Sequence, residues 1–123
     1  MEAKSKAVKK TPYVCPVEVT VDIIGGKWKA VILFHLLDGK KRFGELKKLY
    51  PSISQRILTL QLRQLEHDQI VKREVYAEVP PRVEYSLTEF GESLAPLILE
   101  LKAWGKKYEE KVLHIKNEQA EDW

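Results

Sequence analysis

The segment from residue 40 to residue 63 concentrates the basic side chains of the chain, which could bind a negatively charged partner. It contains seven basic residues and one acid, Glu45, and therefore carries a formal charge of +6 in a chain whose net charge is +3. The seven are Lys40, Lys41, Arg42, Lys47, Lys48, Arg56 and Arg63. Residues 88–112, by contrast, hold five glutamates and four lysines. This asymmetry favours one surface that meets a polyanion, although charge alone is equally compatible with a solvated face.

Inside the basic segment, residues 54–67 predict an amphipathic helix. Leu58, Leu62 and Leu65 recur at helical spacing on one face, and Ser54 stands where an N-cap residue belongs. The opposite face carries Arg56, Thr59, Leu60 and Arg63. The helix is thus expected to bury its leucines and to present a polar, cationic side.

A helix of this kind suits the DNA major groove, which admits one helix and exposes base edges to paired hydrogen bonds from arginine and amide side chains. We assign Arg56 to guanine and Gln55 to adenine edges, and Thr59 and Leu60 to thymine methyl groups. The expected contact residues of the helix are Ser54, Gln55, Arg56, Thr59, Leu60 and Arg63.

The remaining basic residues are better placed for the sugar-phosphate backbone, whose contacts fix register without reading sequence. Phosphate contacts are expected from Lys40, Lys41, Arg42, Lys47 and Lys48. A second group is predicted on a β-hairpin, where the residues that face outward near its tip can reach the minor groove. This group is Lys72, Arg73 and Arg82.

The elements that position these residues follow from periodicity and from Pro and Gly placement. Helices are predicted at 16–24, from about 28 to 37, at 43–49 and at 54–67. Alternating residues predict strands at Val71–Val75 and Val83–Leu87, joined by a Pro-rich tip at 78–81. Thr88 is expected to cap a long last helix that Pro96 kinks or breaks. This order predicts an α+β, mainly α fold: a winged helix-turn-helix with a two-stranded wing and a long C-terminal helix.

Length and composition predict one domain. We divide the chain into a flexible basic arm at 1–12, a single winged-helix domain at 13–115 that includes the dimerisation helices, and a frayed tail at 116–123. The apolar runs are too short for a membrane span, and no secretion signal is recognisable, so a cytoplasmic location is expected. A single cysteine suits a reducing compartment.

That cysteine, Cys15, precedes Pro16 at the predicted start of the first helix. The positive end of the helix dipole should favour a thiolate there, and an accessible thiolate can react with an oxidant, an electrophile or a small thiol. The alternative is an unreactive side chain packed under a dimer interface. The sequence leaves both interpretations open.

The order of elements and an ordered set of motifs resemble the HxlR-type regulators, bacterial winged-helix proteins similar to the MarR group. The motifs are Cys15-Pro16-Val17, Gly25-Gly26-Lys27-Trp28, Arg42-Phe43-Gly44-Glu45-Leu46, Ile53-Ser54, Leu58-Thr59, Leu62-Arg63-Gln64-Leu65-Glu66 and Val79-Pro80-Pro81-Arg82-Val83-Glu84-Tyr85-Ser86-Leu87-Thr88. The resemblance implies a homodimer joined through helix 1 and the last helix, which binds inverted-repeat operator DNA. Two positions depart from the usual pattern: Gln69 replaces a glycine, and Leu60 replaces a polar residue.

Other functional classes find less support. No nucleophile motif, phosphate loop or metal-ligand spacing occurs, so we expect no enzyme, cofactor or metal. His35 is interpreted as a hydrogen-bonded core residue, and Trp28, Trp104 and Tyr108 as packing residues rather than a ligand pocket. The main rival is a winged-helix protein-interaction module without specific DNA binding.

Overall fold

The first four helices begin and end close to the sequence signals that predict them. In the computed structural model, which describes residues 12–114, α1 spans Pro16–Ile24, α2 spans Lys29–Leu36, α3 spans Phe43–Leu49 and α4 spans Gln55–His67. Cys15 occupies the N-cap of α1 in extended conformation, and its thiol forms no capping hydrogen bond. Residues 1–11 of the predicted arm, and the predicted tail, lie outside the described residues.

The last turn of α4 ends in a Schellman motif. The N–H of Ile70 donates to the carbonyl of Leu65, and the N–H of Gln69 donates to the carbonyl of Glu66, both at 3.0 Å. Gln69 is the left-handed residue of this motif, with φ of 66°. The departure from the family's usual glycine therefore falls on a left-handed residue, and glutamine adopts this conformation at a conformational cost.

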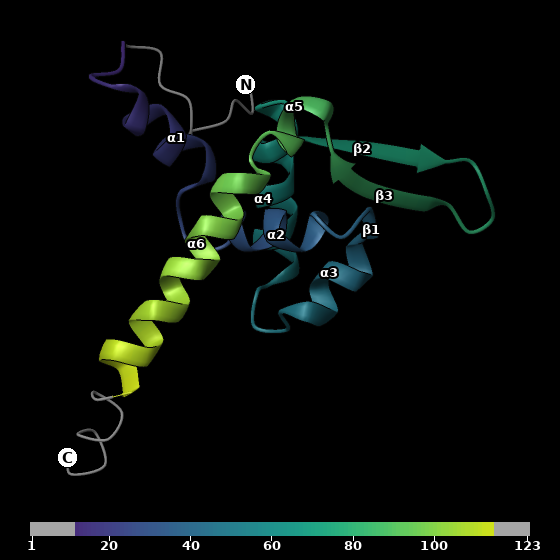
Figure 1. Ribbon diagram of the computed structural model, residues 1–123. Helices are drawn as coiled ribbons and strands as arrows, with labels where there is room; N and C mark the ends of the chain where they lie inside the picture. The colour runs from purple at the N-terminus through teal and green to yellow at the C-terminus, as the bar shows by residue number, and fades with distance from the viewer. Residues whose placement is uncertain (1–11, 115–123) are drawn as a thin grey trace.

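A small antiparallel sheet follows, with strand order β1-β3-β2. Strands β2 (Val71–Tyr76) and β3 (Arg82–Leu87) form the predicted hairpin, and the two-residue strand β1 (Lys41–Arg42) pairs with β3 opposite Tyr85 and Glu84. Figure 1 shows the hairpin extending far beyond the helices. The predicted two-stranded wing thus has a third strand beside it. The sequence did not predict β1, because two residues are too few to show a period-two pattern.

The predicted long C-terminal helix is present, and the predicted break lies just before Pro96, so that two helices occupy this region. Thr88 caps a short α5 (Glu89–Glu92), and its hydroxyl accepts the N–H of Gly91 at 2.8 Å. After a turn, α6 (Ala95–Tyr108) begins with Pro96 in its first turn, where a missing N–H costs nothing, and continues as a π-helical turn at Glu109–Leu113. Pro96 therefore helps to start a helix rather than kinking one.

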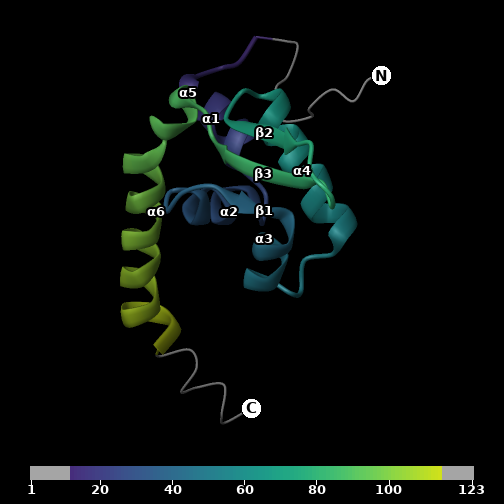
Figure 2. The ribbon, with the colours of Figure 1, turned by 90° about the vertical axis from the view of Figure 1, so that its right-hand side faces the viewer.

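The core lies where α2, α4 and the base of the sheet meet. The side chains buried most completely are Leu33, Leu58, Leu62, Leu65 and Val71. Figure 2 shows α2 between α6 and α4, which lie at opposite sides of the domain. Lys29 of α2 is also buried; burial lowers the pKa of its ammonium, although the charges of Asp68 and Asp22 act against that shift.

Replacing Gln69 by glycine should stabilise the protein. Glycine adopts the left-handed conformation without the Cβ clash, so Gln69→Gly should raise the free energy of unfolding by about 0.5–1 kcal/mol and the melting temperature by about 2–5 °C. Gln69→Ala, which keeps a Cβ, is the matched control and should not gain stability. Thermal unfolding of the three proteins measures the difference. Equal stability of the alanine and glycine variants would contradict the assignment.

Candidate nucleic-acid interface

Helix α4 is the element that positions most of the predicted contact residues. The hydroxyl of Ser54 accepts the N–H of Ile57 at 3.1 Å, which begins the helix, and Leu58, Leu62 and Leu65 are at most 1% exposed. Each buried leucine contributes about 1.5–3 kcal/mol to folding, so this face cannot turn outward. The rotation of α4 about its axis is therefore fixed by its leucines.

The opposite face of α4 is open to solvent. One shallow depression is lined by Gln55, Arg56, Thr59, Leu60 and Arg63. Arg56 and Arg63 are exposed, and neither forms an ion pair with another residue of the 12–114 range. The structure therefore brings these five predicted residues onto one surface, with Ser54 exposed at its N-terminal end.

The basic residues in and around α3 differ in exposure and in whether they have hydrogen-bond partners within the chain. Lys48 is exposed, whereas the ammonium of Lys47 donates to the carbonyl of Pro51 at 2.9 Å and so supports the turn between α3 and α4. Arg42 is exposed at the N-cap of α3, where its backbone N–H donates to the Glu45 carboxylate at 2.7 Å. Lys41, on β1, is half-buried.

On the wing, Lys72 and Arg73 are exposed at adjacent positions of β2 and therefore point to opposite faces of the sheet. Arg82 has partners within the chain instead. Its guanidinium lies 3.1 Å from the Glu78 carboxylate and 3.6 Å from that of Glu84, and it stacks on the Tyr76 ring at 4.2 Å. This predicted DNA contact is thus engaged in holding the hairpin together.

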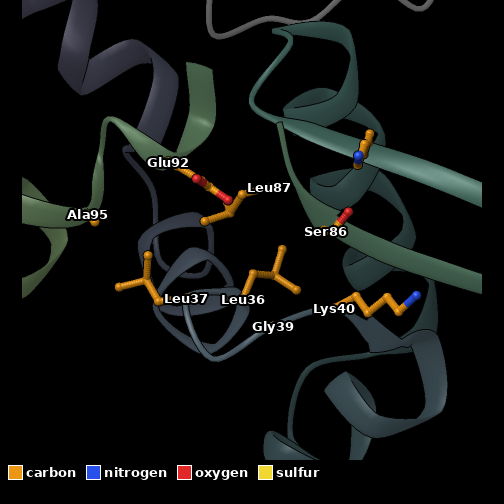
Figure 3. A pocket seen from close by; sticks show the side chains of 9 residues that line it. Leu36, Leu37, Gly39, Lys40, Ser86, Leu87, Glu92 and Ala95 are labelled. Atoms are coloured by element: carbon orange, nitrogen blue, oxygen red, sulfur yellow. The ribbon is translucent and has the colours of Figure 1, made fainter. Parts of the chain in front are cut away.

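Lys40 has the same carboxylate as a partner, with its ammonium 3.2 Å from Glu84. Lys40 and Lys72 both line a groove between the end of α2, the sheet and α5, and Figure 3 shows the Lys40 side chain extending away from the apolar Leu36 and Leu37. The pairing of Glu84 with Lys40 and Arg82 was not among the sequence-based predictions. Its alternation with Val83 and Tyr85 places it on the same face as Arg82, which is the signal that could have revealed the pairing.

The charges around Glu84 set its protonation. Burial acts to raise the pKa of its carboxyl group, but the hydrogen bond from Lys40 and the charges of Lys40 and Arg82 outweigh burial, so the pKa lies below its ordinary value of 4.5. The same hydrogen bond raises the pKa of Lys40. Glu84 is therefore an anion that pairs, within the subunit, with two of the predicted DNA-contact residues, Lys40 and Arg82.

Apolar side chains are exposed on α1 and α6. On α1, Val17 is 68% and Val21 58% exposed, and on α6 Trp104 is 63% exposed. Both helices lie on the side of the domain away from the wing tip (Figure 1). Cys15, at the start of α1, is exposed and reduced. Leu97 and Leu101 continue the exposed stripe of α6.

The aromatic residues have separate surroundings. The predicted core histidine, His35, is half-buried and its Nε2 lies 3.0 Å from the Tyr50 hydroxyl. Trp28 packs edge-on against Tyr50, whereas Trp104 contacts Tyr108 on α6. The described part of the chain contains no cluster of three or more possible metal ligands and no helix long and apolar enough to cross a membrane.

This arrangement matches known proteins in sequence and in fold. Residues 23–113 match the family model described as HxlR-like helix-turn-helix. The chain belongs to this family. It is 65% identical over 98 residues to the HTH-type transcriptional regulator YdeP of Bacillus subtilis (strain 168), a match that covers 80% of this chain and 77% of the relative. The relatives in this family are transcriptional regulators and not enzymes. This protein is likewise a transcriptional regulator with a helix-turn-helix domain.

Two solved structures of the redox regulator HypR resemble the chain closely. The reduced form has 59% sequence identity and a TM-score of 0.77, and the match covers 81% of this chain and 98% of that one. The oxidised form has 62% identity and a TM-score of 0.73, with 76% and 96% covered. These matches support the mainly helical winged fold with a long C-terminal helix.

The Glu84 network gives a stability term with a defined pH window. Because folding lowers the pKa of Glu84, the charged carboxylate stabilises the folded protein fully above pH 4.5. This stabilisation is lost as the pH falls through the pKa that Glu84 has in the folded state. Wild type should therefore be more stable than Glu84→Gln near neutral pH, and this advantage should shrink below pH 4.5. Urea unfolding of both proteins across this range measures it. An advantage that persists unchanged to about pH 3 would contradict the network.

Proposed function

We propose that this protein is a sequence-specific DNA-binding regulator that acts as a homodimer on inverted-repeat operator DNA. The observation that carries the proposal is the orientation of α4, whose leucine face is buried and whose Arg56 and Arg63 are exposed without intramolecular ion pairs among the described residues. A helix so oriented can enter a major groove with its arginines toward base edges.

The wing and α3 supply the expected backbone contacts. Lys48, Lys72 and Arg73 are exposed cations and remain assigned to phosphates, as does Arg42. Lys40, Lys47 and Arg82 have intramolecular partners and would exchange them for phosphate oxygens on binding. Binding should weaken steeply with salt, since each neutralised phosphate releases counterions.

The homodimer is supported by the exposed apolar faces of α1 and α6. Val17 and Val21 are one turn apart on α1, as are Leu97 and Leu101 on α6, and a monomer would leave all four in water. An inverted-repeat operator requires two recognition helices related by a two-fold axis, with half-sites about one helical turn of DNA, or a multiple, apart.

Cys15 is proposed as the redox-sensing residue of this regulator. It is exposed at the N-terminus of α1, next to the proposed dimer interface, and the similar protein HypR is a redox regulator. Because the chain has one cysteine, oxidation can join Cys15 only to a second copy or to a small thiol. Either product would alter α1 and, through it, the spacing of the two α4 helices.

The alternative function is a winged-helix protein-interaction module. The charge of +6 carried by residues 40–63 argues against it, because lysine is depleted at protein interfaces and a surface of one sign suits a polyanion. Binding of a random-sequence duplex library separates the two: the regulator enriches particular sequences, and the module retains none.

Arg56→Ala should relax sequence preference. Loss of a paired hydrogen bond to a base edge should cost about 1–3 kcal/mol on the preferred DNA, with little change on unrelated DNA. Sequences enriched from a random duplex library, followed by affinity measurements for wild type and variant, provide the test. Undiminished affinity and preference would refute the placement of α4.

Lys48→Ala is the contrasting variant, because its cation is expected to meet a phosphate. It should weaken binding to all duplexes alike and reduce the slope of log affinity against log salt by about 1. Affinities over a salt series for preferred and unrelated duplexes measure both effects. A loss confined to the preferred sequence would assign Lys48 to base reading instead.

Oxidation by diamide should modify Cys15 within the dimer. Two thiols lose two protons and two electrons to the reagent, so a disulfide-linked dimer should form, or a mixed disulfide if glutathione is present. Non-reducing electrophoresis and intact mass detect these products. Cys15→Ser should remain a non-covalent dimer by sedimentation and give neither adduct; an unmodified wild type would end the sensing proposal.

A further inference from the structure

One face of the sheet carries several of the cations that the sequence assigns to DNA, together with the Glu84 carboxylate. Alternate residues of a strand point to the same side, so Arg82, Glu84 and Ser86 share this face of β3. The strand register adds Arg42, which stands across from Glu84 on β1, and Lys72, which stands across from Ser86 on β2. The Glu84 carboxylate therefore lies among the cations of a predicted DNA-contact surface.

Glu84 forms ion pairs with two cations at this face. One of its carboxylate oxygens lies 3.2 Å from the Lys40 ammonium, and the other lies 3.6 Å from the Arg82 guanidinium. Glu84 is 9% exposed, whereas the Lys40 side chain is 55% exposed. A phosphate can thus reach the Lys40 ammonium from solvent, while the buried carboxylate competes with it from inside the subunit.

Arg82 is held by more partners than Lys40. Its guanidinium also lies 3.1 Å from the Glu78 carboxylate and 4.2 Å from the centroid of the Tyr76 ring. Arg82 can contact a phosphate only by leaving or sharing these partners. DNA must therefore replace contacts that the free protein already makes, and this exchange opposes binding.

We propose that Glu84 lowers the affinity of the protein for DNA of every sequence by competing with phosphates for Lys40 and Arg82. This inference rests on the proposed DNA-binding function. The ion pairs stabilise the free protein, and after the exchange the carboxylate is left beside the phosphates, where like charges repel. Because phosphate contacts carry no sequence information, the effect falls equally on preferred and unrelated duplexes.

The variant Glu84→Gln separates this role from a purely structural one. Loss of the ion pairs should lower the stability of the fold, and a structural role alone would then weaken DNA binding. Internal competition predicts tighter binding, because the substitution releases Lys40 and Arg82. The direction of the change in affinity therefore distinguishes the two roles.

The test measures the affinity of the full-length wild type and of Glu84→Gln for a preferred and an unrelated duplex over a salt series. Glu84→Gln should bind both duplexes about three- to tenfold more tightly at about 0.1 M salt. The slope of log affinity against log salt should steepen by about 1, and the ratio of the two affinities should not change. Circular dichroism and sedimentation at the assay temperature check the fold and the dimer.

Glu74→Gln is the matched control, because it removes the same charge from the same face of the sheet. Glu74 stands directly across from Glu84 on β2 and accepts the Tyr76 hydroxyl at 3.3 Å. It is exposed and forms no ion pair within residues 12–114. Its loss should tighten binding by no more than about twofold, since salt screens an exposed charge. Equal tightening by Glu74→Gln and Glu84→Gln would assign the effect to net charge and overturn the proposal.

A double-mutant cycle tests whether Glu84 acts through Lys40. Lys40→Gln should weaken binding less in wild type than in the Glu84→Gln background, where the Lys40 ammonium is released. The combined effect should differ from the product of the separate effects by at least about twofold. A simple product would show that Glu84 does not act through Lys40 and would contradict the proposal.

A second variant covers the case in which Glu84→Gln does not fold. Glu78→Gln releases Arg82 alone at an exposed position and should tighten binding of both duplexes by a smaller factor. If folded Glu84→Gln binds DNA no more tightly than wild type, the proposal fails and the proposed function stands. If neither wild type nor the variants bind any duplex, the proposed function fails as well, so the two failures are distinguishable.

Discussion

The packing of the leucine face of α4 is the constraint on which the rest of the structure depends. Leu58, Leu62 and Leu65 are almost fully buried against the core, and turning the helix to hide its arginines would expose all three. That exposure would cost several kcal/mol, since each leucine contributes about 1.5–3 kcal/mol. The outward direction of Arg56 and Arg63 thus follows from apolar burial, and no polar contact is needed to hold it.

The two ends of α4 are fixed by different means. Ser54 satisfies an N–H at the start, and the Schellman motif satisfies carbonyl groups at the end, where Ile70 carries the chain directly into the sheet. Thr88 joins the same junction: its N–H donates to the Ile70 carbonyl at 3.0 Å and its hydroxyl to the Gln69 carbonyl at 2.8 Å. The helix, the wing and α5 are therefore joined by hydrogen bonds at one junction.

The charged groups divide the cationic surface into two sets. Arg56, Arg63 and Lys48 have no anionic partner among the described residues, whereas Lys40 and Arg82 share Glu84. An internal carboxylate of this kind ties Lys40 and Arg82 to the hairpin and reduces the net positive charge of that surface.

The sequence by itself determined the helices, the hairpin and the outward face of α4, because each follows from local spacing, caps and the burial of apolar side chains. The resemblance to the family, which usually has glycine at position 69, pointed to a left-handed residue there, and Gln69 adopts that conformation. Only the tertiary structure decided which cations are free. The partner of Lys40, Glu84, comes from a distant segment, and the pairing of Arg82 with Glu78 and Glu84 depends on how the hairpin closes. The strand β1 depends in the same way on packing between elements, because its two residues pair with β3 and local periodicity does not encode that pairing.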